Sequence, residues 1–97
     1  MPTYVMLMNL TDQGIKEVKG APERIQQGIK AFEAMGGKVM AFYVVMGEYD
    51  YVAIGEAPSD EVALGFLLGL CRQGAVRTTT LRAFTPEQFA GVVSKLP

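Results

Sequence analysis

GEYDYVAIGEAPSDE, residues 47–61, contains a turn, a strand and the start of a helix in one continuous stretch. Its first two residues favour a tight turn, and the β-rich run Tyr49–Ala57 predicts a strand. Pro58 ends that strand because it has no N–H to donate to a sheet. Ser59 can then cap a helix whose first turn is acidic. The segment therefore predicts a hairpin strand that leads directly into a helix.

The residues upstream of this segment predict one strand and one helix. Tyr4–Leu10 is almost continuously apolar, which is typical of a central strand. Pro22 favours the first turn of a helix whose apolar positions recur at helical spacing. The residues off that apolar stripe are polar, namely Arg24, Gln26, Gln27, Lys30 and Glu33. Gly36 ends the helix.

The remaining elements follow in the same way. Lys38–Met46 predicts a second strand, joined to the third by a tight turn at Gly47-Glu48. The helix that begins after Ser59 ends at Gly74, and the β-branched run Val76–Phe84 predicts a fourth strand. Thr85-Pro86-Glu87-Gln88 matches a capping box, so a short last helix is expected.

The order β-α-β-β-α-β-α is that of a ferredoxin-like α+β domain, here a single domain over residues 1–97. It predicts an antiparallel sheet of spatial order 4-1-3-2 with both main helices on one face. Alternation places Met6 and Met8 on one face of strand one and Val5 and Leu7 on the other, so both faces are apolar. Helices can cover only one of them.

The uncovered face would expose on the order of several hundred Å² of apolar surface, more than soluble monomers usually leave contiguous. We therefore expect it to pack on another copy of the chain. The result would be a homodimer or higher homo-oligomer, built as a dimeric α+β barrel.

The composition restricts the classes of partner. Of the 97 residues, 49% are hydrophobic and 20% are charged, with a formal net charge of -1. No run of charge forms the footprint of a nucleic-acid binder, and Val62–Cys71 is about half the roughly 20 apolar residues that a membrane span needs. Met1–Tyr4 lacks the pattern of a secretory signal, and Cys71 is the only cysteine. These features predict a cytoplasmic protein with no nucleic-acid or membrane partner.

Several short segments of the sequence together match a known family. They are Gly47–Asp50, Val52–Ile54, Glu56–Glu61 and Val76–Phe84, while Thr11–Lys16 matches the family's first loop. On these residues the chain resembles the GYD-domain family over nearly its whole length. That family is similar to the dimeric α+β barrel superfamily, which includes cofactor-independent monooxygenases, isomerases, haem enzymes and small-molecule sensors. The resemblance implies the fold and leaves these functions open.

The chain has no histidine, which excludes a histidine general base, a haem imidazole ligand and a histidine-containing metal site. Ser59, Ser94 and Cys71 have no histidine to activate them as nucleophiles. Tryptophan is absent too, unlike the aromatic and histidine arrangements of some relatives of this fold. We therefore expect no metal and no cofactor, and the sequence presents no evident catalytic set.

One polar cluster is predicted by the topology. Strand one runs antiparallel to strands three and four, so its carboxyl end lies beside their starts. The candidate ligand-binding residues there are Asn9, Asp12, Tyr49, Asp50 and Arg77. In one interpretation Asp50 stabilises the turn and pairs with Arg77 or nearby backbone. In the other, Arg77 binds an anionic group while Tyr49 and Asp50 exchange hydrogen bonds or a proton with the ligand.

Other residue groups have simpler interpretations. Tyr4, Glu56 and Arg82 should converge at the opposite end of the sheet as a rim ion pair or a subunit contact. Gly65 and Gly69 predict tight packing of their helix on the sheet. Four further side chains either fill the core or line an apolar pocket: Met6, Met8, Met40 and Phe42.

Three functional hypotheses remain. The first is a homo-oligomeric domain that binds or senses a small molecule. The alternative is a cofactor-independent enzyme, isomerase-like or monooxygenase-like, that acts on a small anionic or aromatic metabolite with Asp50 as proton carrier and Arg77 as anion clamp. The third is a protein-interaction adaptor that uses the edge strands, two and four. A copurifying metabolite would favour the first two, and a copurifying protein the third.

Overall fold

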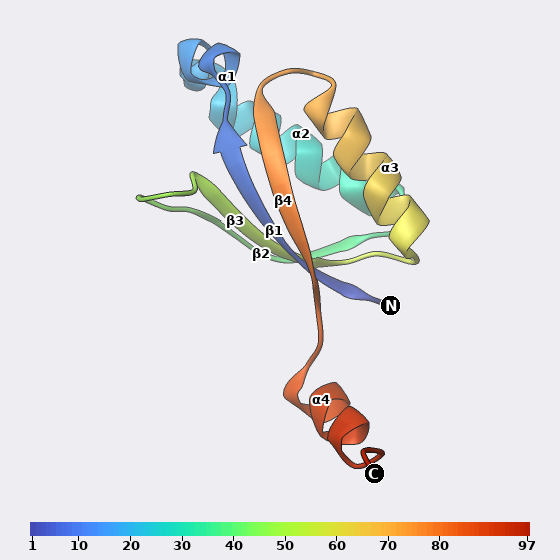
Figure 1. The fold of residues 1–97 in the computed structure, drawn as a ribbon. Coiled ribbons are helices and arrows are strands. Elements are labelled where there is room, and N and C mark those ends of the chain that lie inside the picture. The colour runs from blue at the N-terminus through green and yellow to red at the C-terminus, as the bar shows by residue number, and fades with distance from the viewer.

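The computed structural model describes residues 1–97 as a four-stranded antiparallel sheet, two long helices against it and a C-terminal helix set apart (Figure 1). The sheet order is β2-β3-β1-β4, which confirms the predicted α+β ferredoxin-like topology. The elements in chain order are β1 (Thr3–Leu10), α1 (Asp12–Lys16), a 3₁₀ turn (Val18–Gly20), α2 (Ala21–Ala34), β2 (Lys38–Val44), β3 (Tyr51–Glu56), α3 (Asp60–Cys71), β4 (Val76–Ala83) and α4 (Pro86–Val93). None of these helices is both long and apolar enough to cross a bilayer.

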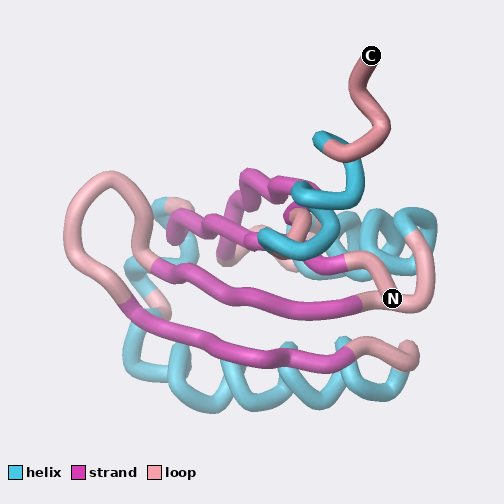
Figure 2. Tube along the Cα trace, turned by 90° about the horizontal axis from the view of Figure 1, so that it is seen from below, coloured by secondary structure: helices cyan, strands magenta, loops and turns pink.

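The helices α2 and α3 cover one face of the sheet, and α2 runs along one side of the strands in Figure 2. Burial alternates along β1: Tyr4, Met6 and Met8 are buried, while the residues between them are only partly buried. Phe32 of α2 packs on these side chains and on Phe66 of α3, with the two ring centroids 4.9 Å apart. This covered face contains the hydrophobic core.

The opposite face of the sheet has no element of the chain over it. We call it the open face; its apolar members are Val5, Leu7, Ala41, Tyr43, Val52, Ile54 and Leu81. Tyr43 and Leu81, from the two edge strands, are 66% and 50% exposed. Both faces are thus apolar, as the alternation predicts, and the chain covers only one of them.

The predicted helix caps are confirmed. The Ser59 hydroxyl accepts a hydrogen bond from the Val62 N–H at 3.2 Å, and both bonds of the capping box between Thr85 and Gln88 are present. Each satisfies first-turn N–H groups that have no partner inside the helix.

The predicted tight turn at Gly47-Glu48 is wrong. Residues 45–50 connect the strands, and β3 begins at Tyr51 instead of Tyr49. Asp50 explains the longer connection: its C=O accepts from the Val45 N–H at 2.8 Å, and its own N–H donates to the Met8 C=O at 3.0 Å. Asp50 therefore bonds to β1 before regular pairing of β3 begins.

The residues after β1 form a short helix that the sequence patterns do not predict. The Thr11 hydroxyl caps α1 by accepting from the Gly14 N–H at 3.1 Å, and it donates to the Gly74 C=O at 2.5 Å. Gly14 is buried against residue 75, where a Cβ would lie 2.1 Å from the Ala75 oxygen. This short helix fastens the end of β1 to the start of β4.

The C-terminal arm, residues 84–97, projects from the sheet and places α4 away from α2 and α3 (Figure 1). The molecule is consequently elongated: its radius of gyration is 14.8 Å, against about 12.5 Å for a typical domain of this length. The large apolar side chains of the arm are exposed, namely Phe84, Phe89, Val92, Val93 and Leu96.

Candidate functional site

The predicted polar cluster lies at the end of the sheet where β1 ends and β4 begins. Asn9 and Arg77 are directly opposite each other in the β1–β4 register. Asp12 is the exposed first residue of α1, and Tyr49 lies in the 45–50 connection. The fold thus brings these backbones to one end, but it forms no ion pair between Asp50 and Arg77.

The Asp50 side chain contacts the backbone of β1. Its Oδ2 accepts a hydrogen bond from the Leu10 N–H at 2.8 Å. Together with the two main-chain bonds of Asp50, this contact joins the 45–50 connection to the end of β1. The geometry matches the structural interpretation of Asp50, and ligand binding by Asn9, Asp12, Tyr49, Asp50 and Arg77 stays a prediction.

At the opposite end of the sheet the partner of Arg82 is Asp60, where the sequence suggested Glu56. Arg82 Nε lies 3.7 Å from Asp60 Oδ1, and the Tyr4 hydroxyl donates a hydrogen bond to the same carboxylate. The guanidinium carbon also lies 5.8 Å from the centre of the Tyr4 ring. Burial, followed by the contact with Asp60, raises the pKa of Tyr4 to about 12. These contacts fasten the start of α3 to the sheet.

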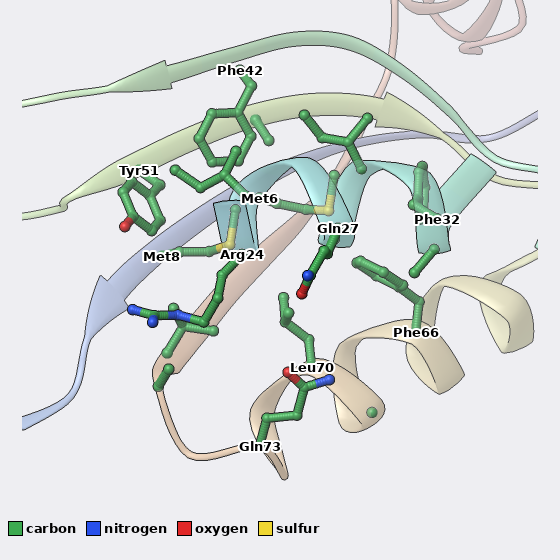
Figure 3. Close-up of a pocket in the computed structure, with 18 of the residues that line it drawn as sticks. Met6, Met8, Arg24, Gln27, Phe32, Phe42, Tyr51, Phe66, Leu70 and Gln73 are labelled. Atoms are coloured by element: carbon green, nitrogen blue, oxygen red, sulfur yellow. The ribbon is translucent and has the colours of Figure 1, made fainter. Parts of the chain in front are cut away.

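An apolar concavity lies between the covered face of the sheet and the helices α2 and α3 (Figure 3). Its volume is about 480 Å³, within the range of small-molecule pockets. Met6, Met8 and Phe42 belong both to its lining and to the core or its immediate surroundings, so both interpretations of these residues apply. Met40 lines neither, because the register of β2 shifts between Val39 and Ala41 and leaves Met40 54% exposed.

The prediction of tight packing at Gly65 and Gly69 is wrong. Both line this cavity, and a Cβ at either position would have no heavy atom within 4 Å. The helices meet at Phe32 and Phe66, and the cavity extends from there toward Met8 and Tyr51 (Figure 3). The glycines therefore leave space in place of a close backbone approach.

Three polar side chains join the mostly apolar lining of this cavity. Arg24 and Gln27 extend from α2, and Gln73 follows α3 (Figure 3). The Nη2 atom of Arg24 is buried and has no hydrogen-bond partner. Burial raises the pKa of Tyr51, an effect that the Arg24 charge partly opposes. Sequence reasoning pointed to an apolar pocket here but missed its polar members, because Arg24 and Gln27 lie off the apolar stripe of their helix.

Comparisons with known proteins agree with this fold and these motifs. The model of the GYD domain matches residues 4–93. A protein of Thermus thermophilus, named glutamine synthetase and cystathionine beta-lyase binding protein, is 38% identical over 84 residues, which are 86% of this chain and 88% of that protein.

Two solved structures have a similar fold. The crystal structure of FFRP-DM1 has a TM-score of 0.56 and 26% identity, covering 87% of this chain and 100% of that one. The hypothetical protein PHS023 from Pyrococcus horikoshii has a TM-score of 0.55 and 25% identity, covering 88% of this chain and 92% of that one. On the domain match and the identity to the Thermus protein, the chain belongs to the GYD-domain family.

Proposed function

We propose that this chain is a homo-oligomeric domain that binds other proteins. The observation behind the proposal is the open face: Val5, Leu7, Val52 and Ile54 form an apolar centre with no charged side chain among them. Such a surface is unfavourable in water and is typical of an interface. A second copy offers the same apolar face, so two sheets can pack on each other with two-fold symmetry.

The total surface supports the same proposal. The chain exposes 6693 Å², whereas a folded monomer of 10.5 kDa is expected to expose about 5,400 Å². The excess of about 1,250 Å² is larger than the roughly 800 Å² that each partner buries in a standard interface. Packing against a second copy would bring the exposed area to that of an ordinary folded chain.

The C-terminal arm also favours association. Its helix α4 has eight residues, too few for a stable isolated helix in water, and its apolar side chains touch no core of their own chain. In the proposed oligomer the arm packs on the neighbouring copy.

The protein partner is inferred from the Thermus relative. That protein's name describes binding to glutamine synthetase and cystathionine beta-lyase. We propose that enzymes of this kind are the partners here too, with the chain acting as an assembled adaptor.

Sedimentation velocity of matched variants tests the assembly. Leu7→Lys places a charge in the open face and should convert the oligomer to a folded monomer, because an unpaired buried charge is costly at an interface. Leu64→Lys, on the exposed side of α3, is the control and should sediment like the wild type. A wild-type chain that sediments as a monomer at micromolar concentration would refute the oligomer.

A second measurement tests the adaptor role. The wild-type chain is mixed with purified glutamine synthetase, or with cystathionine beta-lyase, from the cells that produce it. We expect a larger complex with at least one enzyme by sedimentation or native mass spectrometry. If both enzymes sediment unchanged in the presence of tens of micromolar of this chain, they are excluded as partners, whatever the oligomeric state of the chain.

The cavity supports a second candidate function, small-molecule binding. An apolar space of about 480 Å³ that contains a few polar groups is the usual form of a ligand pocket. Binding of a small molecule beneath the sheet is compatible with assembly through the open face, because the two sites use opposite faces.

A further inference from the structure

Three helical glycines leave the cavity between the sheet and the helices open. Gly28 of α2 and Gly65 and Gly69 of α3 line it, and none would bring a Cβ within 4 Å of another heavy atom. Glycine inside a helix is less favourable than alanine. Here no close packing offsets that cost. The three glycines instead leave space along the cavity that larger side chains would fill.

One cationic side chain extends into this space. Arg24 reaches from α2 toward Met8 and Tyr51 (Figure 3), and its Nη2 atom is buried without an acceptor. The chain provides no carboxylate for it, because the structure's one ion pair joins Arg82 to Asp60. Buried N–H groups are almost always hydrogen-bonded, and a charged one most of all. The missing acceptor therefore points to a group from outside the chain.

The surroundings of Arg24 select the chemistry of that group. A guanidinium pairs best with a planar oxyanion through two parallel hydrogen bonds, which a carboxylate provides. Arg24 is the only charged residue of the lining, so its single positive charge matches a carboxylate better than the two negative charges of a phosphate monoester. Gln27 and Gln73 add neutral donors elsewhere in the lining, and the remaining surface is mostly apolar.

We propose that the cavity binds a small organic acid, with its carboxylate on the Arg24 guanidinium and its apolar body against Met6, Met8 and Phe66. This inference rests on the proposed small-molecule binding and adds the chemical class of the ligand. It does not depend on assembly through the open face.

The six methionines allow a site-specific test with the full chain. Methyl-labelled methionine NMR spectra are recorded during titration with 4-phenylbutyrate and with its uncharged counterpart, 4-phenylbutan-1-ol. Met6, Met8 and Met35 line the cavity and should shift, whereas Met1 and Met46 lie outside it and should not. The acid should bind about tenfold more tightly than the alcohol, the effect of one hydrogen-bonded charge pair.

Two variants complete the test. Arg24→Gln should lower the affinity for the acid about tenfold, to that of the alcohol, and should fold at least as stably as the wild type because it removes an unpaired buried group. Arg72→Gln removes an exposed arginine outside the cavity and should leave the affinity within about twofold.

The outcomes separate the two claims. Equal affinities for acid and alcohol, or an acid affinity unchanged in Arg24→Gln, would overturn the carboxylate assignment while leaving apolar ligand binding in place. No shift of Met6, Met8 and Met35 with either compound at millimolar concentration would overturn both.

Discussion

The two faces of the sheet are similar in sequence and different in environment. On β1, Tyr4, Met6 and Met8 are 5–6% exposed beneath α2 and α3, whereas Val5 and Leu7 lie between them on the face that no element covers. Both sets are apolar and alternate residue by residue. The difference shows that hydrophobicity identifies what must be buried but not whether the same chain buries it. One face makes the core, and the other is the face through which we propose that the chain assembles.

The largest expected effect comes from removing one aromatic side chain from each face of the sheet. Phe32→Ala removes a ring that is 2% exposed and packs on the covered face, so it should lower the free energy of unfolding by about 3–5 kcal/mol. Tyr43→Ala, on the open face, should cost less than about 0.5 kcal/mol in the chain made monomeric by Leu7→Lys. Urea denaturation of both variants gives the two values. Equal losses in the monomer would mean that the open face is packed by its own chain.

A smaller effect is expected from adding a methyl group to the covered face. A Cβ at Gly55 would lie 3.0 Å from the Lys38 carbonyl oxygen and 3.2 Å from side-chain atoms of Met6 and Phe32. Gly55→Ala should therefore destabilise the chain by about 1–3 kcal/mol through overpacking.

Gly28→Ala is the matched control for this methyl group. Its methyl has open space in the cavity, so the substitution should be neutral or stabilise α2 by up to about 1 kcal/mol. If both alanine variants unfold at the same urea concentration as the wild type, the covered face is not close-packed near Gly55.

Much of the fold is predictable from the sequence because it depends on local signals. These signals each extend over a few residues: the alternation in the strands, the helix caps at Ser59 and Thr85, and the end of a strand at Pro58. Together they predict the order of the helices and strands. The sheet order then follows from that element order through topology. The same local patterns predict that both faces are apolar.

The features that sequence reasoning missed depend on distances between elements. Gly65 and Gly69 have the same spacing whether the helix packs tightly or borders a cavity, and only the distance of α3 from the sheet and from α2 decides between them. Tyr4 and Asp60 are 56 residues apart, so no local pattern connects their hydrogen bond. The capping box predicts α4 but not where this helix lies relative to the sheet.

The smallest expected effect comes from the rim of the covered face, where the Tyr4 hydroxyl donates to Asp60. The pKa of Tyr4 rises from 10.0 to about 12 on folding, so the folded chain holds this proton more tightly than the unfolded chain. Its contribution to stability is complete below pH 10 and is lost as the pH rises from 10 to 12. Tyr4→Phe should cost about 1 kcal/mol at neutral pH through the lost hydrogen bond.

The difference in unfolding free energy between the wild type and Tyr4→Phe, measured by urea denaturation from pH 8 to 12, isolates this residue from the other groups that titrate at alkaline pH. We expect the difference to be constant up to pH 10 and to shrink above it, because only the wild type loses the Tyr4 proton. A difference that stays constant to pH 12 would mean that the hydroxyl is as free to ionise as in the unfolded chain. The covered face would then be open to water at its rim, and its contrast with the open face would be weaker there.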